Sequence, residues 1–282
     1  MVKPNRAQST LPAPDVVAKR VDVPTPRVRA NRVALGYRSG TGGEHLAVQE
    51  ATFEIGRSEM VSIVGPSGCG KSTILSAVAG LILPWSGILE VDGNPVRGPG
   101  SDRAVVFQKA ALLPWNTVVD NVAYGLRSYG VKKGPARERA RQMLALVGLE
   151  SVAKSYPYQL SGGMQQRVNL ARALAADPEI LLFDEPFAAL DAQQRETLQN
   201  ELLRIWEDTA KSGLFITHQI DEAVLLGNRV LVSSPGPAST LAHTIEIDLP
   251  WPRSHETRLH PDFPGYVEQI WQLLAPGRRA RH

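Results

Sequence analysis

The chain has 282 residues, of which 43% are hydrophobic and 21% charged, and its formal net charge is +3. This composition is ordinary for a soluble globular protein of one large or two small domains, and the mild basic charge does not by itself indicate nucleic acid binding. The chain contains no run of 18 or more apolar residues, so we expect no membrane-spanning helix. Its only cysteine is Cys69, which excludes intrachain disulfides and cysteine-rich zinc sites. A single cysteine also fits a reducing cytosolic setting.

The first 27 residues are rich in proline, alanine, valine and arginine and show no clear periodicity. They lack the apolar core of a secretory signal, so we expect a disordered basic lead-in over residues 1–27. Residues 28–35 alternate as a strand does, and we expect Gly36 to end that strand before Tyr37. Tyr37 is either an ordinary half-buried tyrosine or an aromatic face for an adenine ring, and the loop described next favours stacking. A flexible turn at 39–44 and a second strand at 48–55 follow.

The most informative segment lies between a buried strand at 60–64 and a helix at 74–81. Gly65, Gly70, Lys71 and Ser72 have the spacing G-x-x-x-x-G-K-[ST], in the strand–loop–helix context that this motif requires. The glycines let successive N–H groups face phosphate oxygens, and the helix N-terminus favours the same anion. A glycine-rich turn without a ligand is the alternative. We predict a nucleotide site formed by Gly65, Pro66, Ser67, Gly68, Cys69, Gly70, Lys71, Ser72 and Thr73, with the lysine on the β- and γ-phosphates and Ser72 on Mg²⁺.

A breaker cluster at 84–87 and a strand with a tight turn at 88–93 come next. The short strand expected at 105–108 ends in Gln108, which either caps the strand or reaches a metal ion or water molecule. From residue 117 to about 176 the pattern is mainly helical, with an amphipathic helix at 135–147. We therefore expect a helical subdomain, at about 112–176, inserted between strands of a sheet.

Within this region, Ser161, Gly162 and Gly163 open a helix at 164–175. Small residues here leave N–H groups and one hydroxyl accessible, which indicates either an ordinary N-cap or a second anion site. One chain cannot easily apply two such sites to one nucleotide. If both are real, a second copy of the chain supplies the second one.

Residues 180–183 form a continuous apolar run, typical of a central strand of a parallel sheet, and Asp184 and Glu185 follow it. We expect Asp184 to hold Mg²⁺ beside the phosphate loop and Glu185 to orient the attacking water. Adjacent strand residues point to opposite faces, so these roles require a turn directly after Asp184, with which Pro186 is consistent. The alternative is a solvated start of a loop.

The remaining elements continue the alternation of helix and strand. A helix at 193–208 precedes a strand at 213–217 that ends in His218, which can hydrogen-bond a γ-phosphate. We expect the other five histidines to lie in polar loops or tails. A helix from 221 and strands at 229–233 and 244–249 complete the domain, and the tail at 250–282 contains an amphipathic helix at 266–274. The basic tip at 278–281 is either solvated or a contact to an anionic membrane surface.

Taken together, these motifs resemble those of the ATPase subunit of ATP-binding-cassette (ABC) transporters over residues 28–250. Residues 65–73 match Walker A, Gln108 matches the Q-loop glutamine, and residues 160–165 match the LSGGQ-type signature with Met164 before the glutamine. Asp184 and Glu185 match the Walker B aspartate and catalytic glutamate, and residues 189–191 match the D-loop. Tyr37 matches the adenine-stacking aromatic residue and His218 the switch histidine.

The resemblance implies an α/β fold for residues 28–249: a RecA-like P-loop NTPase core with an antiparallel β subdomain and the inserted helical subdomain. It implies a head-to-tail homodimer with two ATP molecules at its interface, where Ser161, Gly162 and Gly163 of one copy face the nucleotide of the other. It also assigns catalysis to Glu185, His218, Lys71 and Gln108, nucleotide contact to Asp191 and Tyr37, and Mg²⁺ binding to Ser72, Gln108 and Asp184.

Two segments, 112–131 and 249–253, resemble more narrowly the importer subfamily for nitrate, aliphatic sulfonates and taurine. This implies an ATP-hydrolysing import motor with two permease subunits and, indirectly, a solute-binding protein, on the cytoplasmic face of a bacterial inner membrane. The alternatives are an ABC exporter and, less favoured, a soluble ABC ATPase acting on DNA or ribosomes, which generally has two cassettes, coiled-coil insertions or zinc cysteines. A P-loop GTPase or kinase has no use for the 160–165 signature, and the chain has no N-K-x-D guanine motif.

Overall fold

The structure is a computed structural model that describes residues 25–38 and 43–275. Most of the expected lead-in at 1–27, most of the turn at 39–44 and the whole basic tip at 278–281 lie outside the described residues. The domain boundaries at 27 and 249 therefore stay predictions.

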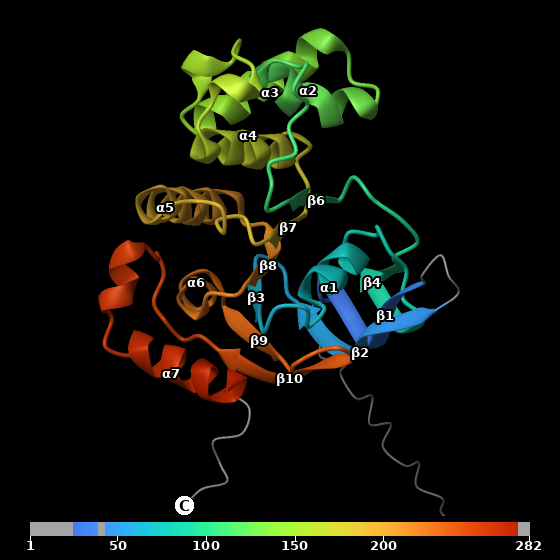
Figure 1. The fold of residues 1–282 in the computed structure, drawn as a ribbon. Helices are drawn as coiled ribbons and strands as arrows, with labels where there is room; N and C mark the ends of the chain where they lie inside the picture. The colour runs from blue at the N-terminus through green and yellow to red at the C-terminus, as the bar shows by residue number, and fades with distance from the viewer. Residues whose placement is uncertain (1–24, 39–42, 276–282) are drawn as a thin grey trace, which may run out of the picture.

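Ten strands of the described chain form one mixed sheet (Figure 1). In spatial order they are β5 (Asn94–Pro95), β4 (Ser86–Val91), β1 (Val28–Arg38), β2 (Glu44–Ile55), β10 (Ser239–Glu246), β9 (Arg229–Ser233), β3 (Met60–Val64), β8 (Ser212–Thr217), β7 (Ile180–Asp184) and β6 (Arg103–Val106). Strands β9, β3, β8, β7 and β6 run parallel, whereas β5, β4, β1 and β2 pair antiparallel. The expected parallel core with an antiparallel β part is confirmed.

The central strands are buried on both faces, as their continuous apolar sequences predict. Along β7, Ile180 and Leu182 pack on one side of the sheet with α1 (Lys71–Val78), while Leu181 and Phe183 pack on the other. The carboxyl ends of β3, β7 and β8 meet at one edge of the sheet because these strands are parallel neighbours. The phosphate loop follows β3, Asp184 is the last residue of β7 and His218 follows β8, so the fold brings them together.

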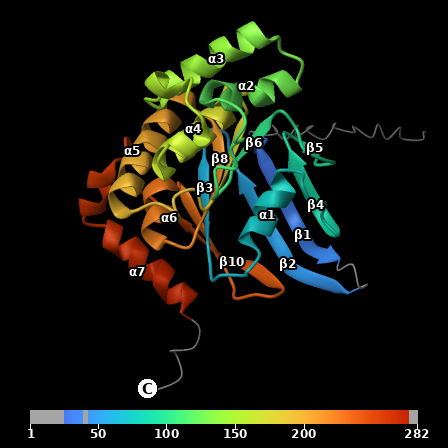
Figure 2. The same cartoon turned by 45° about the horizontal axis from the view of Figure 1, so that its top comes forward.

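The remaining helices cover the second face or form the insertion. They are α2 (Val118–Ser128), α3 (Lys133–Leu146), α4 (Gly162–Ala175), α5 (Ala192–Thr209), α6 (Ile220–Leu226) and α7 (Phe263–Leu274), with short 3₁₀ segments at Glu150–Val152, Pro157–Gln159 and His255–Leu259. Helices α2, α3 and α4 pack on one another and gather at one end of the molecule (Figures 1 and 2). The mainly helical structure expected between residues 117 and 176 is therefore confirmed.

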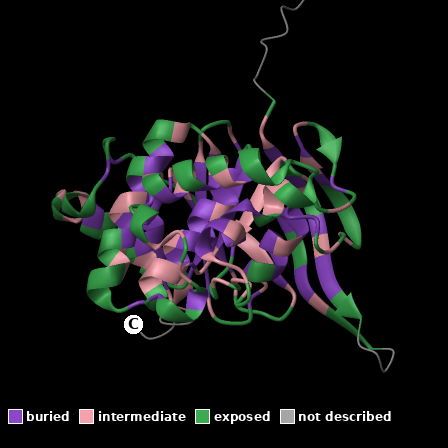
Figure 3. Cartoon of the chain, turned by 90° about the horizontal axis from the view of Figure 1, so that it is seen from above, coloured by how far each residue is buried: buried purple, intermediate pink, exposed green. Residues whose placement is uncertain are grey.

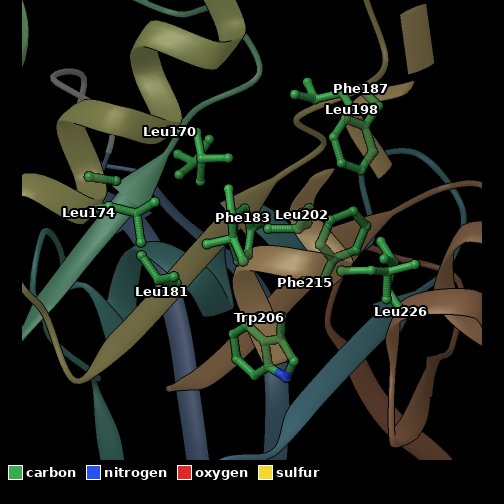
Figure 4. Packing of buried hydrophobic residues seen from close by; sticks show 14 of the residues in the cluster. Leu170, Leu174, Leu181, Phe183, Phe187, Leu198, Leu202, Trp206, Phe215 and Leu226 are labelled. Atoms are coloured by element: carbon green, nitrogen blue, oxygen red, sulfur yellow. The ribbon is translucent and has the colours of Figure 1, made fainter. Parts of the chain in front are cut away.

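Large side chains from β7, β8, α4 and α5 pack together on one face of the sheet (Figure 4). Phe215 lies between Phe183 and Phe187, with ring centroids 5.7 Å apart in both pairs, and Trp206 of α5 is 6% exposed against the same strands. In Figure 3, buried residues gather in the strands and inner helix faces, while the outer helix surfaces are exposed. This layer anchors the strand ends that carry the functional residues.

Several element boundaries differ from the sequence prediction. Strand β1 continues to Arg38 instead of ending at Leu35, because its pairing with β2 resumes at Gly36 and Leu46 after a register shift, and Gly36 leaves room for Trp85. Strand β2 starts at Glu44, β10 spans Ser239–Glu246 rather than 244–249, and β6 ends at Val106, which leaves Gln108 in a loop. The amphipathic helix expected at 266–274 is α7, in which Phe263 and Ile270 are buried and Leu273 is 37% exposed.

Candidate nucleotide site

The loop after β3 has the backbone geometry that its glycines allow. Gly70 has φ +88°, and a Cβ atom there would lie 2.6 Å from Val48 Cγ2 and 3.1 Å from the carbonyl oxygen of Ala47. A Cβ atom at Gly65 would lie 2.8 Å from Cys69 Sγ. Both positions therefore need glycine, which lets the loop curl closely against β2 and against itself before α1 begins at Lys71.

Lys71 is 6% exposed, and its ammonium group is held by the loop itself. Nζ donates hydrogen bonds of 2.9 Å to the carbonyl oxygens of Gly65 and Pro66. No carboxylate among the described residues forms an ion pair with it. Its positive charge is thus available to an anion that enters the loop.

A cavity of about 290 Å³ opens over this loop. Its lining residues are Tyr37, His45, Ala47, Ser67, Gly68, Cys69, Gly70, Lys71, Ser72, Thr73 and Glu185. Tyr37 is 46% exposed, and its hydroxyl lies 3.0 Å from Thr73 Oγ1, so its ring is at the cavity edge and free to contact a base. This arrangement fits the adenine-stacking role expected for Tyr37.

His45 was expected in a polar loop, but it lies in β2 opposite Tyr37 and lines the same cavity. His243, in β10, also lies outside the loops and tails. No clear alternation of apolar and polar residues marks either position in the sequence. Recognising that β2 begins at Glu44 and pairs there with β1 would have placed His45 in a strand opposite Tyr37.

Asp184 ends β7, and its Oδ1 accepts a 2.7 Å hydrogen bond from Ser72 Oγ. Burial raises the pKa of Asp184, the nearby Glu185 raises it further, and the Ser72 hydrogen bond and the Lys71 charge act in the opposite direction. Two oxygen donors beside a phosphate loop suit Mg²⁺, which typically takes one or two carboxylates together with substrate phosphates. These residues therefore fit the expected metal ion. No cluster of three or more histidine, cysteine or acidic side chains that could hold a metal by itself occurs in the described part of the chain.

The turn required directly after Asp184 is present. Glu185 has φ +46°, and its N–H donates to the carbonyl oxygen of Ile216 at 3.0 Å. Glu185 consequently lines the phosphate cavity together with Ser72, and its Oε2 lies 3.1 Å from Nδ1 of His218. The structure brings the two expected catalytic side chains into direct contact.

Gln108 does not line the phosphate cavity in this structure; it is exposed in the loop after β6. The preceding residue is held firmly, because the carbonyl oxygen of Phe107 accepts hydrogen bonds from Gln166 Nε2 at 2.9 Å and Asn169 Nδ2 at 3.1 Å. Arg172 donates to the carbonyl oxygens of Ala110 and Ala111. Sequence reasoning missed this attachment of the Gln108 loop to α4; the available signal was the pair of amides on the buried face of that helix.

Ser161 caps α4, and its hydroxyl accepts from Met164 N at 3.3 Å. With Gly163 it lines a second cavity, of about 210 Å³, beside Gln194 at the start of α5. Asp191 caps α5 by accepting from Gln194 N at 2.9 Å. None of Ser161, Gly162, Gly163 and Asp191 lines the phosphate cavity, so the expected second set of nucleotide contacts lies at a separate place on the described chain.

Comparison with known families gives a match to the model described as ABC transporter over residues 48–188. The taurine import ATP-binding protein TauB of Rhizobium johnstonii is 52% identical over 235 residues, covering 81% of this chain and 88% of the relative. An uncharacterized ABC transporter ATP-binding protein of Methanocaldococcus jannaschii is 48% identical over 233 residues, covering 83% of this chain and 86% of the relative.

Among solved structures, the fold is similar to the ATP-binding cassette MJ0796 in a dimeric post-hydrolysis state bound to ADP and Pi. The TM-score is 0.69 at 31% sequence identity, and the match covers 78% of this chain and 98% of that cassette. The similarity thus spans nearly the whole of a cassette that binds nucleotide as a dimer.

Proposed function

This chain belongs to the ABC transporter ATP-binding family and is an ABC transporter ATPase, and we propose that it drives import of taurine, another aliphatic sulfonate, nitrate or a related small solute. The observation that carries the import assignment is its 52% identity to a taurine import ATP-binding protein across 81% of the chain. No helix of the described residues is long and apolar enough to cross a membrane. We infer that two separate permease subunits form the pathway and that this chain sits peripherally on their cytoplasmic side.

In the proposed mechanism, the loop N–H groups and Lys71 hold the phosphates of ATP while Tyr37 stacks on the adenine ring. Ser72 and Asp184 would hold Mg²⁺, with Gln108 joining them when its loop approaches. When bound, Mg²⁺ supplies positive charge that neutralises phosphate oxygens. These residues position the γ-phosphate for attack from the side of Glu185.

Glu185 would accept a hydrogen bond from the attacking water and orient it toward the γ-phosphorus. The water oxygen forms the new P–O bond, the bond to the β-phosphate oxygen breaks, and ADP and phosphate leave. His218, 3.1 Å from Glu185 through Nδ1, is placed to hydrogen-bond the γ-phosphate and orient the carboxylate. Positioning and charge neutralisation, rather than covalent chemistry, account for the acceleration.

We further propose a head-to-tail homodimer. The separation of the phosphate cavity from the cavity at Ser161 and Gly163 supports it, since a second copy can bring the latter to the nucleotide of the first. The dimeric state of the MJ0796 cassette supports the same arrangement. Opening and closing of the dimer would move the permease subunits through the surface near residues 108–121, with the solute-binding protein involved only indirectly.

The proposed function is tested by purifying the chain with the permease subunits that accompany it and measuring ATP hydrolysis in liposomes. We expect stimulation when a solute-binding protein loaded with taurine or another sulfonate is added outside, together with inward movement of the labelled solute. The Glu185→Gln variant should bind ATP but neither hydrolyse it nor move solute, and Lys71→Ala should lose tight ATP binding.

Three results would contradict the proposal in different ways. Outward movement of solute would mean an exporter, and stimulation by DNA or ribosomes with no permease recovered would place the chain outside transport. Full turnover by Glu185→Gln would reject the catalytic assignment while leaving the transport assignment intact.

A further inference from the structure

We propose that Thr217 and Glu222 are positioning residues for hydrolysis, which fix the backbone on both sides of His218 and thereby aim its imidazole at Glu185 and the γ-phosphate. This inference rests on the role of His218 in the proposed function. It concerns a buried polar cluster behind the site rather than the residues that face the nucleotide.

The centre of the cluster is the hydroxyl of Thr217, the last residue of β8, which is 1% exposed. Oγ1 lies 2.6 Å from Oε2 of Glu222 and accepts a 3.0 Å hydrogen bond from the backbone N–H of Gln219. A single hydroxyl thus joins the residue before His218 to the residue after it. The segment that carries the imidazole is closed into a small hydrogen-bonded ring.

Glu222, in the first turn of α6, is 3% exposed and has both carboxylate oxygens occupied. Oε2 faces Thr217, and Oε1 accepts from Nε2 of Gln199 at 3.1 Å. Burial raises the pKa of Glu222, and the Thr217 hydrogen bond and the Arg195 charge oppose that rise. The Thr217 hydroxyl donates its proton to Glu222 Oε2 and accepts from the Gln219 N–H through a lone pair. Glu222 therefore fixes the orientation of the Thr217 hydroxyl.

Arg195 of α5 connects this cluster to the segment that precedes α5. Its Nε lies 3.8 Å from Glu222 Oε1, while the guanidinium also donates to Gln219 Oε1 at 3.2 Å and to the carbonyl oxygen of Leu190 at 3.0 Å. Leu190 directly precedes Asp191, a proposed nucleotide contact of the dimer. The same cluster thus ties the His218 segment to the Asp191 segment within one copy.

This support matters because the His218 side chain is half exposed and Glu185 is its only hydrogen-bonding partner among the described residues. An exposed imidazole on an unrestrained loop would sample many orientations. Displacement of about 1 Å from the productive geometry can cost about 100-fold in rate. A fixed backbone at Thr217 and Gln219 removes most of this freedom before ATP arrives.

The experiment compares Thr217→Val, which keeps the shape and removes the hydroxyl, with Thr217→Ser, which keeps the hydroxyl. We expect Thr217→Val to lower kcat for ATP hydrolysis about tenfold with KM for ATP changed less than about twofold, and Thr217→Ser to remain within about twofold of the unmodified protein in both. Glu222→Gln should lie between them, since an amide oxygen can still accept from Thr217. Thr209→Val, which removes a hydroxyl bonded to the Ile205 carbonyl oxygen far from the site, is the matched control and should not change kcat.

A cycle with His218→Ala distinguishes positioning from general destabilisation. If Thr217 acts through His218, Thr217→Val should have no further effect in the His218→Ala background, which single-turnover rates with labelled ATP can resolve. The same fold loss in both backgrounds, or unchanged kcat in Thr217→Val, would overturn the inference while the function stands. Unchanged hydrolysis in His218→Ala itself would reject both the inference and the proposed role of His218.

Discussion

At the scale of one residue, the ionised carboxylate of Asp184 lowers the stability of the nucleotide-free fold and is also the group that we propose binds the metal ion. Its carboxylate is partly buried, and burial together with the like charge of Glu185 raises its pKa above the ordinary value of 3.8. A raised pKa means that the folded protein holds this proton more tightly than the unfolded chain does. Ionisation at neutral pH therefore opposes folding until a cation joins the carboxylate.

We predict that Asp184→Asn raises the unfolding midpoint of the nucleotide-free protein at pH 7.5, by about 2 °C, while removing Mg²⁺-dependent hydrolysis. The sign follows from linkage: stability from this group falls as pH rises from 3.8 to the raised pKa, and the penalty is complete above it. The gain should therefore shrink as the pH of a melting series is lowered through that window. Asp208→Asn, on the exposed face of α5, is the control, and a lower midpoint for Asp184→Asn throughout would refute the argument.

At this scale the sequence predicted the phosphate loop, the pair of acidic residues and the turn between them well. Those residues are specified locally, by glycines and by the end of an apolar strand. Gln166 and Asn169 were missed because both bond the Phe107 carbonyl oxygen, which lies 59 and 62 residues away along the chain. His45 was missed because its place opposite Tyr37 depends on the pairing of β1 with β2. Periodicity carries no information about such contacts.

At the scale of elements, the β3, β7 and β8 cores were predictable because they are short apolar runs buried on both faces. The ends of β1, β2 and β10 were not, since their outer parts are held by pairing rather than by hydrophobic sequence. Ser239 and Thr240 of β10 pair with Val48 and Glu50 of β2, and Ser239 Oγ donates to the Cys69 carbonyl oxygen. The start of β10, which the hydrophobic pattern does not predict, thus supports the phosphate loop through the Cys69 carbonyl oxygen.

The segment 249–253, noted first as a subfamily resemblance, has a structural explanation in Arg253. This side chain is 3% exposed, lies 4.6 Å from the Trp251 ring, and donates to the carbonyl oxygens of Val224, Leu225 and Gly227 at the end of α6 and to those of Ile247 and Leu249. Burial lowers its pKa to about 10, which still leaves it charged at neutral pH. A cation at a helix C-terminus also stabilises the helix dipole.

We predict that Arg253→Met lowers the free energy of unfolding by about 3 kcal/mol, because buried carbonyl groups at the end of α6 lose their donors. Urea titration followed by tryptophan fluorescence measures this change. Arg204→Met, an exposed arginine with one hydrogen bond to the Leu146 carbonyl oxygen, should cost less than about 1 kcal/mol. Equal losses of unfolding free energy in the two variants would show that the Arg253 contacts at the end of α6 stabilise the fold no more than one exposed hydrogen bond does.

At the scale of the whole molecule, the described chain has two separate surfaces that we propose bind one nucleotide together only in a dimer. One is the phosphate cavity at the carboxyl ends of the parallel strands, and the other is the start of α4, where Ser161 and Gly162 are exposed. A substitution that disturbs the second surface without affecting the first or the fold can test whether a partner uses it. Gly162 is suited to this, because a Cβ atom there meets nothing within 4 Å and the residue lies in the first turn of a helix.

We predict that Glu185→Gln becomes dimeric in ATP and that adding Gly162→Glu keeps it monomeric, by placing a negative charge against the phosphates of the partner's ATP. Size-exclusion chromatography with light scattering measures the mass. ATP titration at a protein concentration too low for dimerisation should give the same affinity for both variants, because the phosphate cavity of each copy is intact. Gly134→Glu, at an equally open position in the first turn of α3, is the matched control and should still dimerise. Dimerisation of the Gly162→Glu variant would mean that the start of α4 faces away from the partner's nucleotide, and a parallel loss of ATP affinity would mean that the two surfaces are not independent. The head-to-tail arrangement predicts that only the dimer is lost.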